Sequence, residues 1–160
     1  RPMRIDVSRV LPDTEGAGQY RGSPSVLVEF TAVGADIVCA LATDNTVFAA
    51  QGVRGGLAGA PTWAGIRDLD GEERNLGGFA HLDLSPGEYL ISKSSAGGGY
   101  GAPTEREPQL VRHDVLEGYI SRDRALEVYG VIVGPDGSID TSPRTRRSDQ
   151  HSTTNNVSDR

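Results

Sequence analysis

Glycine constrains this chain more than any other residue, since 21 of its 160 residues are Gly, against a usual share of about 7%. Because Gly weakens helix interiors and permits backbone conformations that other residues avoid, this surplus argues against long helices and for many turns. Many of the glycines gather in two stretches, residues 51–61 and 97–101. The first stretch is expected to be a loop or an extended irregular segment.

The length of the chain, 160 residues, is that of about one domain, and 36% hydrophobic residues suffice for a core. A single Cys excludes a disulfide framework and a Cys-rich zinc site. The net charge of −6 argues against nucleic-acid binding. No apolar run approaches the roughly 20 residues of a membrane span, and there is no signal-peptide core. We therefore expect a cytoplasmic protein that binds neither nucleic acid nor membrane.

Residues 141–160 differ in composition from the rest of the chain. They contain four Arg and two Asp, and Val157 is their only apolar residue. Such a segment cannot offset the entropy of ordering itself. We expect residues 1–140 to form one domain and residues 141–160 to be a flexible tail, or a segment ordered only against a partner.

Alternation of apolar and polar residues predicts strands through most of the first 93 residues. Half-buried strands are expected around residues 3–7, 26–30 and 37–41, and further strands around 82–84 and 89–92. Residues 63–76 are typical of a hairpin with its tight turn at Asp70-Gly71.

The pattern changes to that of helices after residue 101. Pro108 suits a first helical position and Gly118 a helix end, while Ser121 can cap a second helix that ends at Gly130. A last buried strand is expected at residues 131–133. The predicted fold class is mainly β: a single β-sandwich or barrel-like domain with two short C-terminal helices and a flexible tail.

The residue types that usually carry catalysis are isolated in this sequence. His81, His113 and His151 are far apart, and none has a second ligand at metal-binding spacing. Cys39 lies within an apolar strand pattern, which favours a buried, unreactive thiol. No metal site and no catalytic residue is therefore predicted.

The stretch Gly97, Gly98, Gly99, Tyr100, Gly101 is the strongest candidate for a functional segment. It is not a phosphate-binding P-loop, because no Lys-Ser or Lys-Thr follows it, and no helix starts at its end as in a dinucleotide-binding motif. Two interpretations stay open: a tight crossing between the sheet and the helices, or a backbone lining for a ligand channel or a partner subunit.

Several separated stretches resemble the C-terminal end of the hydantoinase B and oxoprolinase family, which includes a carboxylase branch. They are residues 13–22 (Asp-Thr-Glu-Gly-Ala-Gly-Gln-Tyr-Arg-Gly), 55–61, 84–88, 97–108, 114–121 and 128–131. Their order and spacing agree with the family from about residue 1 to 134. The chain is similar to only the last quarter of family members, which are several hundred residues long.

The resemblance implies a small subunit of a cytoplasmic ATP-dependent complex. Its partners would be larger subunits, including an actin-like ATPase subunit. ATP and a divalent metal are expected in those partner subunits, and no cofactor is expected on this chain alone.

Three functions follow as expectations. The first is a structural or site-lining subunit of an ATP-dependent ketone carboxylase of the acetophenone carboxylase type, which forms a C–C bond with bicarbonate. The alternatives are the same role in an ATP-dependent amide hydrolase of the hydantoinase or oxoprolinase type, and a non-enzymatic binding module.

Overall fold

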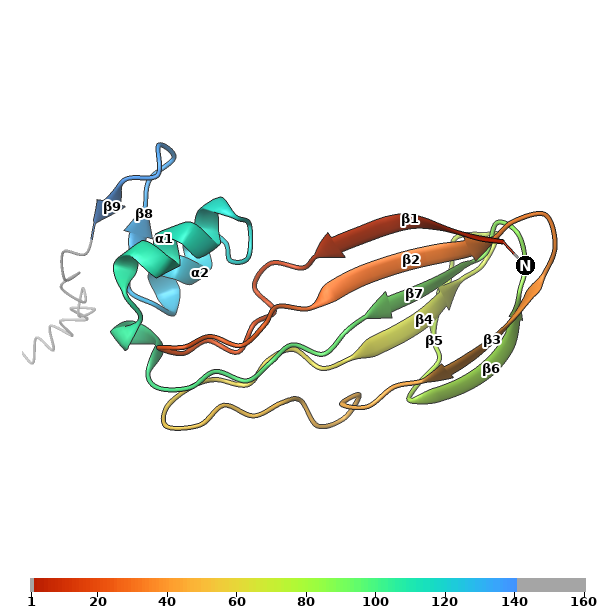
Figure 1. Cartoon of the computed structure of the whole chain (residues 1–160), viewed down its shortest axis with the longest axis horizontal. Helices are drawn as coiled ribbons and strands as arrows, with labels where there is room; N and C mark the ends of the chain where they lie inside the picture. Colours follow the sequence, from red (N-terminus) through yellow and green to blue (C-terminus); the bar gives the residue numbers. More distant parts are fainter. Residues whose placement is uncertain (1, 141–160) are drawn as a thin grey trace, which may run out of the picture.

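The computed structural model of this chain describes residues 2–140. Two sheets lie at one end of an elongated molecule and two short helices lie at the other, joined by long extended segments (Figure 1). The tail predicted for residues 141–160, and His151 within it, lie outside the described residues.

The larger sheet has five antiparallel strands in the order β1-β2-β7-β4-β5. Their bounds are β1 Met3–Val10, β2 Val26–Ala32, β4 Trp63–Arg67, β5 Glu73–Asn75 and β7 Tyr89–Lys93. The predicted hairpin is confirmed, because β4 pairs with β5 around Gly71, whose φ of +88° suits a residue without a Cβ.

The smaller sheet pairs β3 (Ile37–Ala42) with β6 (Phe79–Leu84) and packs against one face of the larger sheet. The apolar cluster between the two sheets consists of buried Ile66, Leu84 and Leu90 with the partly buried Phe30, Ile37, Cys39, Leu76 and Leu82. The mainly β fold with two short helices is confirmed. The sheets form an open sandwich of unequal halves, and residues 2–140 contain no closed barrel.

Strand β1 is less buried than its alternating pattern predicts. Met3 and Ile5 are 56% and 55% exposed, although the strand itself forms as expected and pairs along its length with β2. The reason is its position, because β1 lies at the edge of the larger sheet and the cluster between the sheets draws its residues from other elements.

The helical end contains α1 (Pro108–Leu116) and α2 (Arg122–Glu127), with the short pair β8 (Ile132–Val133) and β9 (Ile139–Asp140) beside them. The predicted signals are confirmed: Pro108 begins α1, Gly118 follows it at φ +73°, and the Ser121 hydroxyl accepts the Arg124 N–H at 3.1 Å. A second apolar cluster lies here, formed by Ala17, Val111, Ile120, Ala125, Tyr129, Val131 and Val133.

Three extended stretches connect the sheets to the helices. We call residues 14–23, 50–60 and 95–101 the glycine bundle, since they hold eleven of the 21 glycines. They belong to no named strand and are joined by isolated bridges instead. The extended irregular segment predicted for residues 51–61 is therefore confirmed.

Candidate functional site: the glycine bundle

The central segment of the bundle, residues 95–101, is hydrogen-bonded to both of its neighbours. The Gly97 N–H donates to the carbonyl oxygen of Ser23, and the Gly97 carbonyl oxygen accepts the N–H of Gly16, both at 2.9 Å. Gly99 is bonded to the other neighbouring segment, residues 50–60. It donates its N–H to the carbonyl oxygen of Leu57 at 2.9 Å. These bonds give partners to backbone groups that a regular sheet would otherwise pair.

Gly98 and Gly99 have no space for a side chain. A Cβ on Gly99 would lie well within 3.0 Å of the Ala17 carbonyl oxygen, and one on Gly98 equally close to the Gln51 carbonyl oxygen. The approach is mutual, because a Cβ on Gly16 would meet the backbone nitrogen of Gly99 at 2.5 Å. Contacts within this chain therefore account for the missing side chains.

The five predicted lining residues do not share one environment. Gly99 and Gly101 are buried, Gly97 and Gly98 are half-buried, and Tyr100 is exposed. The glycines form a tight crossing between the sheets and the helices. Only Tyr100 of the five presents a large side chain to the surface, so a partner-lining role for this stretch stays a proposal that depends mainly on Tyr100.

Tyr100 is joined to two other segments of the bundle. It exchanges backbone hydrogen bonds with Tyr20 at 2.9 and 3.0 Å, and their ring centroids lie 6.2 Å apart. It also forms a bridge with Val53, and the Arg54 guanidinium lies 5.5 Å from the centre of the Tyr100 ring. No local sequence pattern predicts a pairing of Tyr100 with Tyr20. The only sequence signal was the family-like Tyr-Arg-Gly at residues 20–22.

A buried carboxylate joins α1 to the bundle. Asp114 is 1% exposed, and its Oδ2 accepts from the Arg106 guanidinium at 2.9 and 3.1 Å. Its Oδ1 lies 3.0 Å from Nε of Arg21. Arg106 also donates to the carbonyl oxygen of Gln19 at 3.1 Å. Asp114 thus holds two arginines from different parts of the chain.

A second buried carboxylate joins α2 to the bundle. Glu15 is 1% exposed, and its Oε1 accepts from Nε of Arg124 at 2.7 Å and from the Tyr129 hydroxyl at 3.0 Å. Burial, and next the negative charge of Glu15, raise the pKa of Tyr129 well above its usual value of 10. Both carboxylates are held in ion pairs, so this region fits a structural junction better than a reaction centre.

The isolated histidines and the cysteine are not brought together by the fold. His81 and His113 are exposed. Cys39 lies in β3 as predicted but is half-buried and not fully buried, and burial raises the pKa of its thiol. Within residues 2–140, no group of three or more His, Cys, Asp or Glu side chains is placed to hold a metal ion. None of the helices described is long and apolar enough to cross a membrane.

The residues that form the glycine bundle and the two sheets match a known protein family. Residues 1–103 match the family model for Hydantoinase B/oxoprolinase. The chain belongs to this family, as the separated motifs indicated.

Named relatives add detail to this assignment. Caprolactamase subunit beta of Pseudomonas jessenii is 32% identical over 147 residues, which cover 87% of this chain and 25% of that subunit. The acetone carboxylase alpha subunit of Xanthobacter autotrophicus is 51% identical over 61 residues, which cover 37% of this chain and 7% of the subunit. The chain thus spans about a quarter of the caprolactamase subunit.

The fold has a counterpart among solved structures. The crystal structure of the ATP-dependent caprolactamase from Pseudomonas jessenii superposes with a TM-score of 0.70 at 28% identity, covering 88% of this chain and 25% of that one. The similarity therefore includes nearly all of this chain, helices as well as sheets.

Proposed function

We propose that this chain is a structural part of an ATP-dependent enzyme complex of the Hydantoinase B/oxoprolinase family. The observation that carries the proposal is the similarity to caprolactamase subunit beta over 87% of this chain. The chain spans 25% of that subunit, and we propose that it functions together with the rest of the family's fold and with larger subunits.

The contacts of the polar groups support a structural role. Asp114 and Glu15 are the carboxylates buried at the junction, and both are paired with arginines. His81 and His113 are exposed and distant from each other in the sequence. We propose that the reacting atoms, ATP and a divalent metal are bound by partner subunits, among them an actin-like ATPase subunit, in the cytoplasm.

The similarity to caprolactamase, which covers most of this chain, favours an amide as the substrate class. The relative matched over most of this chain is a caprolactamase, and its solved counterpart is described as ATP-dependent. Water attacks an unactivated amide slowly, so coupling to ATP hydrolysis would serve to activate the amide carbonyl for that attack. We propose that the complex opens an amide bond, as in a lactam or hydantoin ring.

Ketone carboxylation is a second candidate, with one observation in its favour. A 61-residue segment is 51% identical to the acetone carboxylase alpha subunit, a higher local identity than that of the caprolactamase match. In this case the complex would join the bicarbonate carbon to the carbon next to the ketone carbonyl, which would lose a proton, while one bicarbonate oxygen would leave with a phosphoryl group from ATP. An acetophenone carboxylase type of complex is the finer form of this proposal.

Measurement of ADP release by the purified complex tests both candidates. The chain is co-purified with its larger partners and supplied with ATP and either a lactam, a hydantoin, or a ketone with bicarbonate. We expect ADP release that depends on a lactam or hydantoin and is lost when this chain is omitted. Release that depends on ketone and bicarbonate would favour carboxylation instead. A chain that purifies as a monomer without partners would overturn the proposal in favour of a binding module.

A further inference from the structure

Exposed apolar side chains follow the glycine bundle and the loop that leads into it. They are Tyr20, Val47, Phe48, Val53, Leu57 and Tyr100, which we call the neutral strip. Phe48 is 82% exposed and its neighbour Val47 is 78% exposed. Single exposed apolar residues are common, but several gathered on one part of a surface mark an interaction site.

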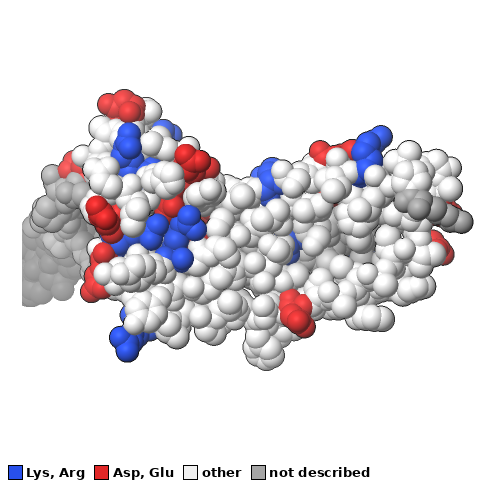
Figure 2. All heavy atoms as spheres, in the orientation of Figure 1, with Lys and Arg blue, Asp and Glu red and all other residues white. Residues whose placement is uncertain are grey.

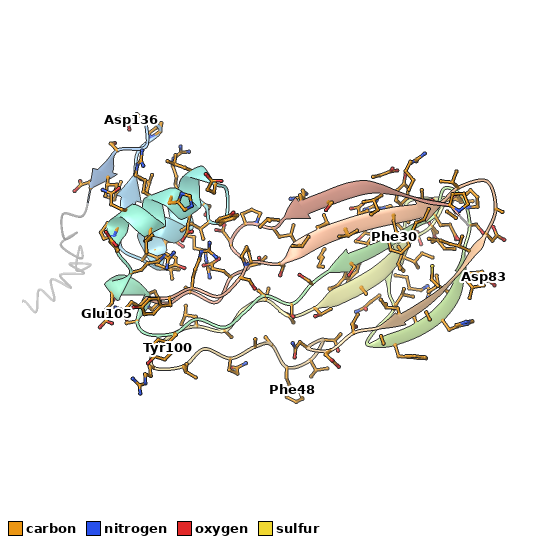
Figure 3. The ribbon with its side chains drawn as sticks, in the orientation of Figure 1. Phe30, Phe48, Asp83, Tyr100, Glu105 and Asp136 are labelled. Carbon is orange, nitrogen blue, oxygen red and sulfur yellow. The ribbon has the colours of Figure 1, made fainter. Side chains whose placement is uncertain are left out.

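Backbone contacts hold much of the strip together. Tyr20 and Val53 each form a bridge with Tyr100, so three of the members come from adjoining segments. Leu57 belongs to the same hydrogen-bonded array through its carbonyl oxygen, which accepts the Gly99 N–H. Figure 3 shows that Phe48 and Tyr100 lie along the same lower side of the molecule.

The strip carries few charges along its length. Between Asp44 and Arg67 the only charged residue is Arg54, and between Lys93 and Glu105 there is none. The carboxylates lie at its two ends, where Asp44 is beside Phe48 and Glu105 and Glu107 are beside Tyr20. In Figure 2 the middle of the displayed face is largely white, whereas charged residues crowd the helical end. Interface centres in other proteins are likewise depleted of charge and enriched in Tyr and Phe.

An open hollow lies at the Phe48 end of the strip. It has a volume of about 560 Å³ and is lined by Thr43, Asp44, Asn45, Thr46, Val47 and Phe48. The loop that forms it is tied to the rest of the chain, since the Asn45 carbonyl oxygen accepts the Thr62 N–H at 3.0 Å. The hollow offers a place where a partner's side chain can insert next to Phe48.

Another exposed apolar region lacks these properties. On the outer face of the smaller sheet, Phe79 and Val38 are 74% and 63% exposed, but they share that face with His81 and Asp83. A charged group that lost its water there without a partner would oppose docking. This face serves as a control for the strip.

We infer that the neutral strip is the surface by which this chain packs against the part of the family's fold that corresponds to the other three quarters of the relatives' length. The inference rests on the proposed function. The caprolactamase subunit contains this quarter and the remainder in one polypeptide. The remainder therefore needs a surface on this quarter, and a strip with few charges fits a partner surface that is itself apolar and poor in charge.

Binding of variants to a polypeptide that corresponds to the other three quarters of the relatives' length, from the same source, tests the inference. The strip variants are Phe48→Ser and Tyr100→Ser, and the matched controls are Phe79→Ser and Val38→Ser. Because aromatic residues at interface centres carry much of the binding energy, we expect each strip variant to raise Kd about tenfold or more. The controls should bind as the wild type does. Circular dichroism and thermal unfolding of each free variant show whether it remains folded.

Amide hydrogen exchange gives a second readout that needs no substitution. Exchange over residues 44–57 should slow in the complex, while exchange over β6 should not change. Strip variants that bind with unchanged Kd, or protection of β6 without protection of residues 44–57, would overturn the inference and leave the proposed function standing. Failure of the wild-type chain to bind the larger polypeptide would overturn the proposed function itself, and the inference with it.

Discussion

Gly99 packs against Ala17 so closely that the carbonyl oxygen of Ala17 occupies the position a Cβ of Gly99 would need. The two residues are far apart in the sequence and lie in different segments of the glycine bundle. Neither segment can move away freely, because the Ala17 carbonyl oxygen also accepts the Leu57 N–H at 2.7 Å. The contact therefore makes residue 99 intolerant of any side chain.

Replacing Gly99 by Ala should destabilise the free chain strongly. The added methyl group forces backbone apart, and at so close a contact we expect a cost of about 3 kcal/mol, the upper end of the usual range for overpacking. For a chain of this size, that corresponds to a fall in Tm of roughly 6–12 °C. Gly78→Ala is the control, because its nearest obstacle lies 3.3 Å away and it should change Tm little. Equal Tm values for the two variants would contradict the packing described for the bundle.

Replacing Asp114 by Asn should destabilise the chain, because the two arginines that pair with Asp114 would lose its negative charge. Arg106 is 9% exposed and would lose its charged partner, as would Arg21. Breaking a buried ion pair in this way costs about 3–5 kcal/mol. Urea denaturation gives the free energy of unfolding, with the exposed Asp83→Asn as control. A loss below about 1 kcal/mol would mean that the pairs contribute little.

The stability of the chain should fall as the pH rises above 10. The folded pKa of Tyr129 is raised above its usual value of 10, so its contribution is complete below pH 10 and decreases above it. Tyr129→Phe should remove this part of the pH dependence and cost about 1 kcal/mol near neutral pH, because the hydrogen bond to Glu15 is lost. Urea denaturation at pH 8, 10 and 11 measures both effects. The matched control is Tyr20→Phe, which removes an exposed hydroxyl that makes no hydrogen bond to Glu15.

The carboxyl group of Asp6 should titrate at unusually low pH. Hydrogen bonds from Arg4 and then from Tyr89, both at 2.6 Å, lower its pKa from 3.8 to about 2. Its contribution to stability is therefore present above pH 3.8 and is lost as the pH falls through 2. Carboxyl carbon NMR measures this pKa directly, and Arg4→Gln should move it back toward 3.8. An unchanged value in that variant would show that Arg4 is not the main cause.

Sequence patterns that extend over only a few residues were sufficient to predict most of the helices and strands. Alternation predicted β2 and β3, and Pro108, Gly118 and Ser121 marked the limits of the helices because caps act within one turn. Burial was less predictable. The pattern of Met3 and Ile5 indicates a strand but not its place in the sheet, and at the edge one face of that strand has little to pack against.

The partners in the candidate site depend on contacts between distant residues. Glu15 meets Arg124 and Tyr129, which follow it by 109 and 114 residues, and no local pattern specifies such a pairing. The glycines at residues 97–101 indicated a close approach of backbone. The identity of the approaching segments, residues 16–23 and 51–57, required the folded structure.

The glycine bundle has a consequence for how the two ends of the molecule depend on each other. The apolar clusters of the sheets and of the helices share no residue, and the segments between them are linked largely through peptide groups. A peptide hydrogen bond depends on backbone geometry and hardly at all on side-chain identity. The bundle therefore works as a spacer whose shape depends on its own backbone, while the orientation of the helical end also depends on the pairs Asp114–Arg21 and Glu15–Arg124 that attach it to the bundle.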